Sequence, residues 1–417
     1  MTVFASSAAF AQTAAQIDAV VLDEMAKQNI VGMAVGIMKN GNIYFAKGYG
    51  HTDLARTVPV TTHTIFRWGS ISKTLTATAT LKLAEENPGF NLNDKVTEHV
   101  SYWPDYGNRG NIRIKHLLSN RSGIIHYTKK KNCPDNKAPG YSRSRHSSNA
   151  YNAEQAVAVF RNQKLCFDPG TRYRYSTFGY SLLGSAIEGG SGMSYAAWVR
   201  DKIKTPLAMS SLQQATGTRK GFDQRCHILK QVYDDNSAWK LPGGGWESNI
   251  IDLAKFANGL LQGSLLNDTS RLWTSVAGNP AYGYGIKYAP DKSQVWHQGK
   301  QDNSRALLYP YPGSADQLGI VLMINGIHSK PMRIAHHLAD LFGRNHNDSE
   351  APVVKSCDNT CSGTFSAVWR KTNKDVLLRR AYNHDDFYAE WKFLHQAGYY
   401  TDDIEPYVCL LYTSPSP

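Results

Sequence analysis

Long apolar segments and metal-binding motifs are both missing from this sequence of 417 residues. No uncharged apolar run reaches the roughly 18 residues that a membrane-spanning helix needs. The sequence has no Cys-x-x-Cys pair, no His-Glu-x-x-His motif and no other clustered spacing of His, Asp and Glu that is typical of a metal site. His336 and His337 lie in a helical pattern, and we interpret them as part of a helix face. We therefore expect neither a membrane span nor a bound metal.

Acidic residues are fewer than basic ones, 34 against 46, which gives a formal net charge of +12. Part of the excess lies at residues 129–131, Arg143 and Arg145, in a stretch rich in Pro, Ser and Asn. A nucleic-acid-binding protein would instead carry a basic stripe with aromatic residues on a recognisable module. The stretch is consistent with a solvated loop, or with a rim that attracts anionic substrates. We expect no nucleic-acid partner.

Cysteine is scarce, with six residues, and this number fits an exported protein with a few disulfides. Cys133 and Cys166 flank a long polar stretch, and Cys357 and Cys361 bracket three residues. Each pair is a candidate disulfide, although spacing does not determine the pairing and free buried thiols are the alternative.

The N-terminus lacks a basic residue before Lys27, yet residues 3–11 resemble the end of a secretory signal. Ala9 and Ala11 supply an A-x-A cleavage pattern before Gln12. We interpret residues 1–11 as the remnant of a signal peptide and expect a periplasmic or extracellular protein. An ordinary frayed terminus is the alternative.

The hydrophobic content of 41% is sufficient for one large core, and its pattern changes along the chain. Residues 32–50 have the pattern of a β-hairpin, and further strands are predicted near the C-terminal end of the main core. The segments between them are mostly helical. This order predicts an α+β fold, with an antiparallel sheet built from both ends of the sequence, flanking helices and an inserted helical domain. The predicted strands are 284–288, 294–297, 306–309 and 320–324, and the predicted helices are 12–28, 71–86, 114–118, 180–188, 250–261 and 332–342.

Two helix boundaries are predicted from specific residues. The helix at 180–188 is expected to stop at Gly189 and Gly190, because glycine commonly ends helices. The helix at 250–261 follows Asn249, and Asp252 stands three residues later in the arrangement of a capping box.

The most informative motif is Ser70-Ile-Ser-Lys73 at the start of the predicted helix 71–86. Residues three apart share one face of a helix. The free N–H groups and the positive dipole of a helix start favour a developing oxyanion. A lysine kept neutral by burial can accept the serine proton. The motif therefore predicts a nucleophile and its base for acyl transfer.

A lone Ser-x-x-Lys carries little information, and Ser237-Ala-Trp-Lys240 is a second match. It precedes Leu241-Pro242-Gly243, which we expect to be unable to continue a helix, so the two side chains need not share a face. We therefore interpret this second match as unrelated to catalysis.

Two further segments favour Ser70. Tyr175 lies on a turn directly before a helix, where its hydroxyl could relay protons, although a packing tyrosine is the alternative. His297-Gln-Gly299 ends an apolar strand, and the glycine would let substrate approach the strand edge. The backbone N–H of Lys300 is then a second candidate oxyanion donor beside that of Ser70. Taken alone, His297 is more typical of a structural histidine.

Together and in this order, these elements resemble the serine β-lactamase/penicillin-binding-protein superfamily. The resemblance is to its branch of class C β-lactamases, D-Ala-D-Ala carboxypeptidases and β-lactamase-like esterases, which use Ser-x-x-Lys, Tyr-x-Asn, and Lys-Thr-Gly or His-x-Gly. It covers roughly residues 12–345 and includes the stretches HLLSNRSG (116–123), FDPGT (167–171), FGYSLLG (178–184), GGG (243–245) and DLA (252–254).

The resemblance implies a role for each matching residue. Ser70 would be acylated, Lys73 would be its base, and Tyr175 would shuttle protons. His297 and Gly299 would belong to the strand that lines the substrate. Thr177 stands where the family usually has asparagine, and its hydroxyl reaches less far than a carboxamide, so recognition of an amide side chain is in doubt. The family branch needs no metal, and we expect no cofactor.

A second, small unit is expected at 361–408, after a linker at 348–360. A strand at 364–369, a helix at 385–394 and a last strand ending near Tyr407 are predicted. The unit resembles one copy of a bacterial tandem-repeat module that accompanies β-lactamase-like domains in polyglycine hydrolases. Residues 409–417 resemble translated sequencing adapter rather than natural protein.

We therefore expect residues 12–347 to form a serine hydrolase domain that acts through an acyl-enzyme at Ser70 on an ester or a peptide/amide. A D-Ala-D-Ala carboxypeptidase or a β-lactamase is the first alternative. The second, of another class, is a non-hydrolytic protein that binds peptidoglycan or peptides.

Overall fold

The computed structural model describes residues 3–127, 152–215, 219–223, 229–233 and 237–344, together with three strands at 365–370, 376–382 and 400–403. Side chains are described for residues 14–344 within these ranges, apart from residue 233. Several predictions lie outside the described residues: most of the insert at 127–150, the linker at 348–360, the helix at 385–394, the tail at 409–417 and all cysteines except Cys166.

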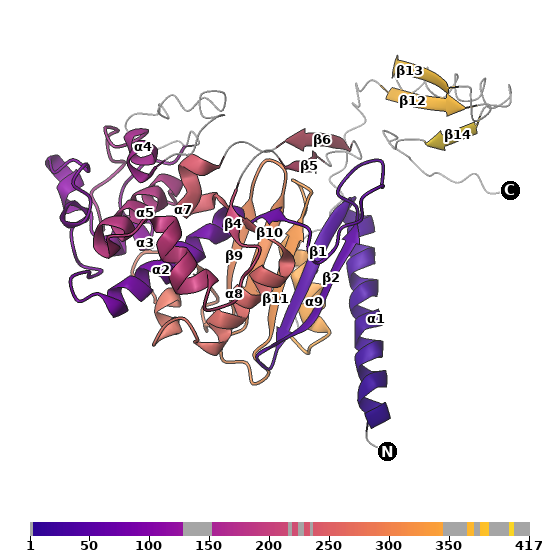
Figure 1. Ribbon diagram of the computed structural model, residues 1–417, viewed down its shortest axis with the longest axis horizontal. Coiled ribbons are helices and arrows are strands. Elements are labelled where there is room, and N and C mark those ends of the chain that lie inside the picture. The colour runs from indigo at the N-terminus through magenta and orange to yellow at the C-terminus, as the bar shows by residue number, and fades with distance from the viewer. Residues whose placement is uncertain are drawn as a thin grey trace.

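The main sheet has six strands in the order β2-β1-β11-β10-β9-β8, and all neighbouring strands are antiparallel (Figure 1). Their bounds are β1 Gly32–Lys39, β2 Asn42–Gly50, β8 Lys287–Tyr288, β9 Val295–Lys300, β10 Arg305–Pro310 and β11 Gly319–Ile324. Strand β1 from the start of the sequence pairs with β11, with Met33 opposite Ile324. This pairing confirms the predicted α+β fold, in which an antiparallel sheet is built from both ends of the chain.

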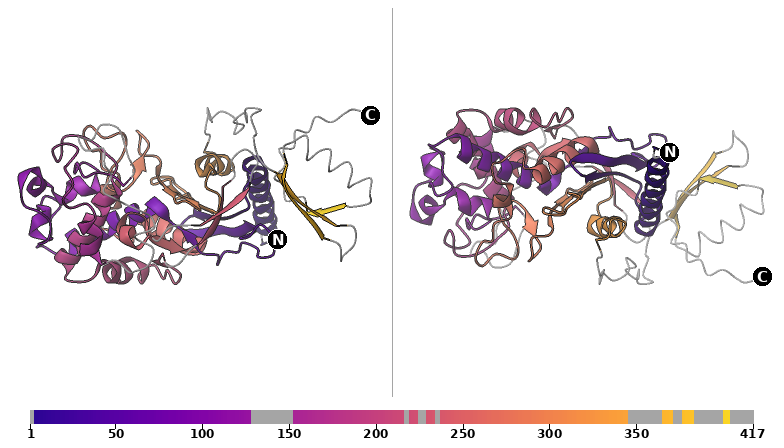
Figure 2. Two further views of the ribbon diagram at one scale, coloured as in Figure 1. Left: turned by 90° about the horizontal axis from the view of Figure 1, so that it is seen from above. Right: turned by 90° about the horizontal axis from the view of Figure 1, so that it is seen from below.

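The sheet is covered on both faces because its buried strands alternate their side chains. In β11, Ile320 and Leu322 belong to the core beneath α1 (Val3–Gln28) and α9 (Pro331–Asp340). Val321 and Met323 belong to the larger core that includes α8 (Ile250–Gln262). Figure 2 shows α8 and α9 on opposite faces of the sheet.

Short helices between β3 and β8 form the helical part of the molecule (Figure 1). At their centre, α2 (Ser72–Glu86) packs against α5 (Thr177–Ser191). Apolar residues of α2 such as Leu75, Ala77 and Leu81 are fully buried. The other helices are α3 Ile114–Leu118, α4 Ala153–Ala158, α6 Tyr195–Val199, α7 Leu241–Gly244, the π-helix Arg200–Lys204 and the 3-10 helices η1 Gly69–Ile71, η2 Val96–Glu98, η3 Gly107–Asn111, η7 Ala238–Lys240 and η8 Thr269–Trp273.

The predicted stop of α5 at Gly189 and Gly190 is wrong, since the helix continues to Ser191 and ends at Gly192 in the left-handed region, with a φ of 70°. The two glycines have a packing role instead. A Cβ at Gly189 would lie 1.7 Å from the carbonyl oxygen of His99, so this helix interior must lack a side chain there.

Two other predictions need smaller corrections. The strand predicted at 284–288 is reduced to Lys287–Tyr288, because Gly285 has a φ of +74° and its N–H is bonded to Leu118. The capping box of α8 is half formed. Asn249 accepts from the Asp252 N–H, whereas the Asp252 carboxylate accepts the backbone N–H groups of residues 211 and 212.

Three short sheets complete the described structure. Strand β3 (Phe66–Arg67) pairs with β7 (Trp246–Ser248), which also pairs with β4 (Gln213–Gln214). This sheet holds the segment that leads into α2. The second sheet pairs β5 (Lys220–Asp223) with β6 (Lys230–Tyr233), and the third has β12 (Phe365–Arg370) between β13 (Val376–Tyr382) and β14 (Tyr400–Asp403). Strand β12 corresponds to the strand predicted at 364–369, and β13 was not predicted.

Candidate active site

Ser70 lies in the tight turn that connects β3 to α2. Gly69 has a φ of +51°, and a Cβ on it would lie 2.8 Å from the backbone nitrogen of Lys300. The neighbouring Trp68 is fixed by two hydrogen bonds, from its backbone N–H to Trp246 and from its indole N–H to Ser248. Ser70 is half-buried, and its N–H belongs to the first turn, where helical N–H groups have no partner within the helix. A tight turn that depends on glycine therefore presents this hydroxyl beside strand β9.

Lys73 is fully buried directly beside Ser70. Its Nζ lies 3.3 Å from Ser70 Oγ, 3.1 Å from Thr177 Oγ1 and 2.5 Å from the carbonyl oxygen of Gly243. Burial, and to a lesser degree the positive charge of Lys240, lowers the pKa of Lys73 well below its usual range. A neutral amine has two hydrogens to donate and one lone pair. It can therefore donate to two of these oxygens, those of Thr177 and Gly243, and accept the proton of the Ser70 hydroxyl.

Tyr175 approaches Ser70 from the other side. It directly precedes α5, whose first turn is capped by the Ser176 hydroxyl. Its ring centroid lies 4.7 Å from Lys73 Nζ, and the Ser70 hydroxyl is close enough to act on the pKa of its phenol. Burial raises the pKa of Tyr175 well above its usual range, although the nearby Ser70 hydroxyl acts in the opposite direction. Near neutral pH this side chain is a phenol that can donate a proton.

Strand β9 brings a backbone N–H toward Ser70. The Gln301 N–H is bonded to Ser304, so these two residues form a hydrogen-bonded pair at the β9–β10 hairpin. Such pairs alternate along an antiparallel ladder, and Lys300 is opposite Arg305 in the next position. The Lys300 N–H therefore points away from β10 and toward Gly69, whereas its side chain is exposed.

Gly299 is required for a different reason from the one suggested by the sequence. We expected glycine to let substrate approach, but a Cβ here would lie 2.0 Å from the carbonyl oxygen of Trp68. The protein's own backbone fills that space. The glycine lets the turn that carries Ser70 lie directly against β9.

His297 is buried and neutral. Burial, followed by the charge of Lys73, lowers the pKa of His297 to about 3. Its Nδ1 lies 3.0 Å from the Gln298 carbonyl oxygen, which can only accept, so Nδ1 carries the hydrogen. Its Nε2 then accepts from the Tyr282 hydroxyl at 3.3 Å. Both nitrogens are engaged, and this histidine supports the strand and the nearby tyrosines.

The second Ser-x-x-Lys match also lies at the site, which the sequence analysis did not anticipate. Pro242 is tolerated in the first turn of α7, so the chain does continue helically after Lys240, contrary to expectation. Ser237 and Lys240 are bridged by Gln301, whose Oε1 lies 3.1 Å from Lys240 Nζ and whose Nε2 lies 3.5 Å from Ser237 Oγ. The amide between them separates this serine from its lysine.

Sequence reasoning missed several other contributors. Gly243 acts through its carbonyl oxygen, and the run of three glycines was the available signal for a close backbone approach. Tyr180 and Tyr282 form a buried pair next to Tyr175. No sequence pattern distinguishes them from the other tyrosines of the chain.

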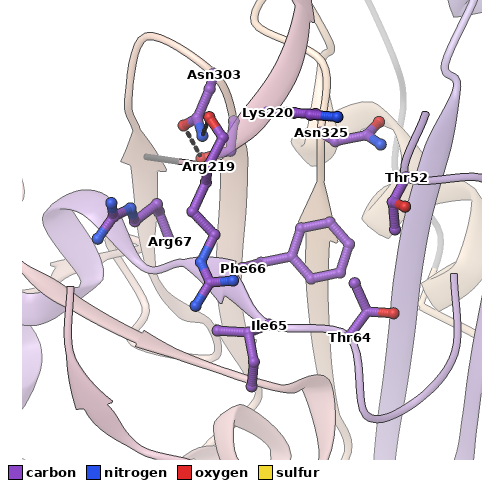
Figure 3. Close-up of a pocket in the computed structure, with 10 residues that line it drawn as sticks. Thr52, Thr64, Ile65, Phe66, Arg67, Arg219, Lys220, Asn303 and Asn325 are labelled. Carbon is purple, nitrogen blue, oxygen red and sulfur yellow. Dashed lines mark hydrogen bonds between the residues drawn. The ribbon is translucent and has the colours of Figure 1, made fainter. Parts of the chain in front are cut away.

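A cavity of about 260 Å³ lies beside β3 and is lined by Phe66, Arg67, Arg219 and Asn303, among others (Figure 3). Arg67 and Arg219 both contact Glu247, at 3.1 and 2.6 Å. Because the Glu247 carboxylate is fully buried, this ion-pair cluster fixes β3 against β7 and the start of β5. Ser70 does not line this cavity.

The described part of the chain contains neither a candidate metal site nor a candidate membrane-spanning helix. No group of three or more His, Cys, Asp or Glu residues there could hold a metal ion. His336 and His337 both belong to α9, and His337 contacts Glu24 at 3.1 Å. None of the described helices is long and apolar enough to cross a membrane.

The Beta-lactamase family model matches residues 17–344. The chain belongs to this family. It is 27% identical to Protein flp of Staphylococcus aureus (strain N315) over 396 residues, which cover 91% of this chain and 75% of flp. It is 28% identical to the human mitochondrial serine beta-lactamase-like protein LACTB over 295 residues, covering 56% of this chain and 53% of LACTB.

Solved structures agree with this family assignment. The octameric penicillin-binding protein homologue from Pyrococcus abyssi is 26% identical with a TM-score of 0.66, covering 80% of this chain and 78% of that one. Two further proteins share the fold. They are a D-stereospecific amidohydrolase from Streptomyces sp. (22%, TM-score 0.62, coverage 77% and 97%) and EstCE1, a hydrolase with promiscuous acyltransferase activity (18%, TM-score 0.66, coverage 80% and 99%). The chain is an enzyme of the serine hydrolase superfamily.

Proposed function

We propose that this enzyme hydrolyses ester or amide bonds through an acyl-enzyme at Ser70. The observation that carries the proposal is the 3.3 Å contact of one half-buried hydroxyl, that of Ser70, with the buried amine of Lys73, which in turn lies 4.7 Å from the ring centroid of Tyr175. A nucleophile within reach of its base is the geometric requirement for covalent catalysis.

In the acylation step, Ser70 Oγ forms a bond to the carbonyl carbon of the substrate while its proton moves to Lys73 Nζ. The negative charge that develops on the carbonyl oxygen is stabilised by the N–H groups of Ser70 and Lys300. Tyr175 donates its proton to the leaving group as the bond to the carbonyl carbon breaks, and it regains a proton from Lys73. Water then attacks the acyl-enzyme by the same route in reverse.

A short-chain ester is the substrate class that we favour within this scheme. Thr177 Oγ1 already accepts from Lys73, and a threonine hydroxyl reaches less far and offers fewer hydrogen bonds to a substrate amide than a carboxamide does. The fold shared with EstCE1 is compatible with an esterase. The similarity to a penicillin-binding protein homologue keeps a D-Ala-D-Ala peptidase or β-lactamase as the second candidate.

The test compares two serine variants. We expect Ser70→Ala to abolish hydrolysis of p-nitrophenyl acetate or butyrate and to prevent labelling by a fluorophosphonate. Ser237→Ala is the matched control and should retain both activities. Mass spectrometry of the intact, labelled protein should locate the adduct at Ser70. Full hydrolysis by Ser70→Ala would reject the assignment, and nitrocefin turnover faster than ester turnover would favour the second candidate. A wild-type protein that hydrolyses neither substrate and takes no label would favour a binder of peptidoglycan or peptides.

We also propose that the protein is exported to the periplasm or the extracellular space. Cys166 is disulfide-bonded, to a partner outside the described residues, and disulfides persist mainly in oxidising compartments. Thiol alkylation of the protein isolated from its native host, followed by fractionation, tests this. A reduced Cys166 in the cytoplasmic fraction would contradict export.

A further inference from the structure

A second lysine is buried next to the proposed catalytic base. Lys240, at the end of η7, is 4% exposed. Its Nζ donates to Gln301 Oε1 at 3.1 Å and lies 5.3 and 5.7 Å from the ring centroids of Trp239 and Tyr127. The amide oxygen and the two aromatic faces are all suited to a cation. None of these contacts assigns Lys240 a role in the steps described above.

Both lysines converge on the same short turn. Lys73 Nζ donates to the carbonyl oxygen of Gly243 at 2.5 Å, and Gln301 Nε2 donates to the carbonyl oxygen of Gly244 at 2.6 Å. The stem of Lys240 packs against Gly244, where a Cβ would lie 3.7 Å from its Cδ. Gln301 thus clamps the Lys240 ammonium to the turn that holds the Lys73 amine.

Four titratable side chains face Lys73 from the elements packed around it. The rings of Tyr175 and Tyr180, from the start of α5, lie with their centroids 4.7 and 5.6 Å from its Nζ. His297 comes from β9, and beyond its burial the charge of Lys73, together with the smaller effect of Lys287, lowers its pKa. The tyrosines and the histidine are neutral near pH 7, so among the described groups that act on Lys73 the charge comes from Lys240.

We propose that Lys240 is an electrostatic positioning residue of this site: its buried ammonium, fixed by Gln301, repels a proton from Lys73 and keeps that amine in the form that accepts the Ser70 proton. Two like charges in a water-poor interior repel far more strongly than they do in water. The inference rests on the proposed function, because it gives Lys73 the role of base.

The experiment is the pH dependence of kcat/KM for p-nitrophenyl acetate, which carries no net charge. In the wild-type enzyme the rate falls as the pH drops through the pKa of Lys73. Lys240→Met keeps most of the aliphatic side chain and removes the charge. The acid limb, which is the low-pH part of the profile where kcat/KM falls, should therefore move to higher pH by about one unit. At a fixed pH on this limb, that shift is about a tenfold loss, which shrinks as the pH rises. Lys240→Arg keeps the charge and should keep the wild-type limb.

Two controls separate electrostatics from structure. Lys27→Met removes one positive charge from an exposed ion pair on α1 and should leave the profile unchanged. Gln301→Glu keeps the lysine stem and places a carboxylate beside it, so the limb should move in the same direction even if Lys240→Met fails to fold.

The proposal is overturned if the limb stays in place in both Lys240→Met and Gln301→Glu, or if Lys240→Arg moves it as far as Lys240→Met does. It is also overturned if Lys240→Met raises KM only for anionic esters, with an unchanged limb, because Lys240 would then be a substrate contact. Ester hydrolysis that persists in Ser70→Ala would be a separate result, because it would contradict the proposed function itself and not only the role of Lys240.

Discussion

Replacing Gly299 by alanine should damage catalysis through the backbone rather than through a lost side chain. The new Cβ would lie 2.0 Å from the carbonyl oxygen of Trp68, whereas real Cβ contacts are essentially never closer than 3.0 Å. The strand or the turn must therefore move by 3.0 minus 2.0, or 1.0 Å. The clashing atom is the backbone carbonyl oxygen of Trp68, two residues before Ser70, so rotation of a side chain cannot relieve the clash.

The size of the effect follows from this displacement. A misplacement of about 1 Å in an active site can reduce the rate about 10²-fold, which corresponds to about 2.7 kcal/mol of transition-state stabilisation. The overpacking should also lower the free energy of unfolding by about 1–3 kcal/mol. We expect kcat/KM for p-nitrophenyl acetate and the rate of fluorophosphonate labelling to fall together, because both need Ser70 and the Lys300 N–H in register.

The matched control is Gly179→Ala in the first turn of α5. There a Cβ would lie 3.5 Å from Ser122 Oγ, an ordinary contact, and the backbone is helical. Activity should be retained, and stability should be unchanged or higher by up to about 1 kcal/mol, since alanine is the better helix former. Wild-type kinetics in folded Gly299→Ala would refute the close backbone contact on which the reasoning depends.

Other substitutions test separate parts of the structure. Tyr175→Phe should reduce kcat for an ester by about 10²–10⁴-fold if its hydroxyl transfers the proton, and an unchanged kcat would leave it a packing residue. Glu247→Gln removes the carboxylate shared by two arginines and should lower the free energy of unfolding by about 3–5 kcal/mol, as measured in urea; an unchanged midpoint would contradict this role. Gly189→Ala should destabilise the protein by about 1–3 kcal/mol through its contact with His99 while Ser70 labelling in the folded fraction persists. Without the contact with His99, alanine at this helical position would instead be neutral or stabilising in a thermal melt.

The sequence allowed the sheet and the nucleophile to be predicted because both depend on local patterns. The hairpin at 32–50 and the strands around 297, 307 and 322 alternate or run apolar over short segments. Ser70 and Lys73 are one turn apart, so their proximity follows from helix geometry alone. These are the cases in which spacing along the chain determines spacing in the structure.

The failures came from contacts between residues distant in sequence. Gly189 was interpreted as a helix stop, whereas its lack of a side chain is required by His99, which lies elsewhere in the chain. Lys240 was set aside because Leu241-Pro242-Gly243 was expected to be unable to continue a helix, whereas α7 begins at Leu241. Its neighbours Gln301 and Gly244 come from segments whose approach depends on the folded sheet. Neither fact is encoded in a local pattern.

The antiparallel pairing of β1 with β11 has a consequence for synthesis of the protein. Met33 emerges from the ribosome early, but its partner Ile324 is made almost 300 residues later, because 324 minus 33 is 291. Until β11 is made, one edge of β1 has no neighbouring strand. Strand β9, which lies beside Ser70, is then not yet joined to β1, because β10 and β11 connect the two. A chain interrupted before β11 would expose that edge to other chains. We therefore expect slow acquisition of activity after translation, and aggregation rather than partial function in C-terminally truncated products.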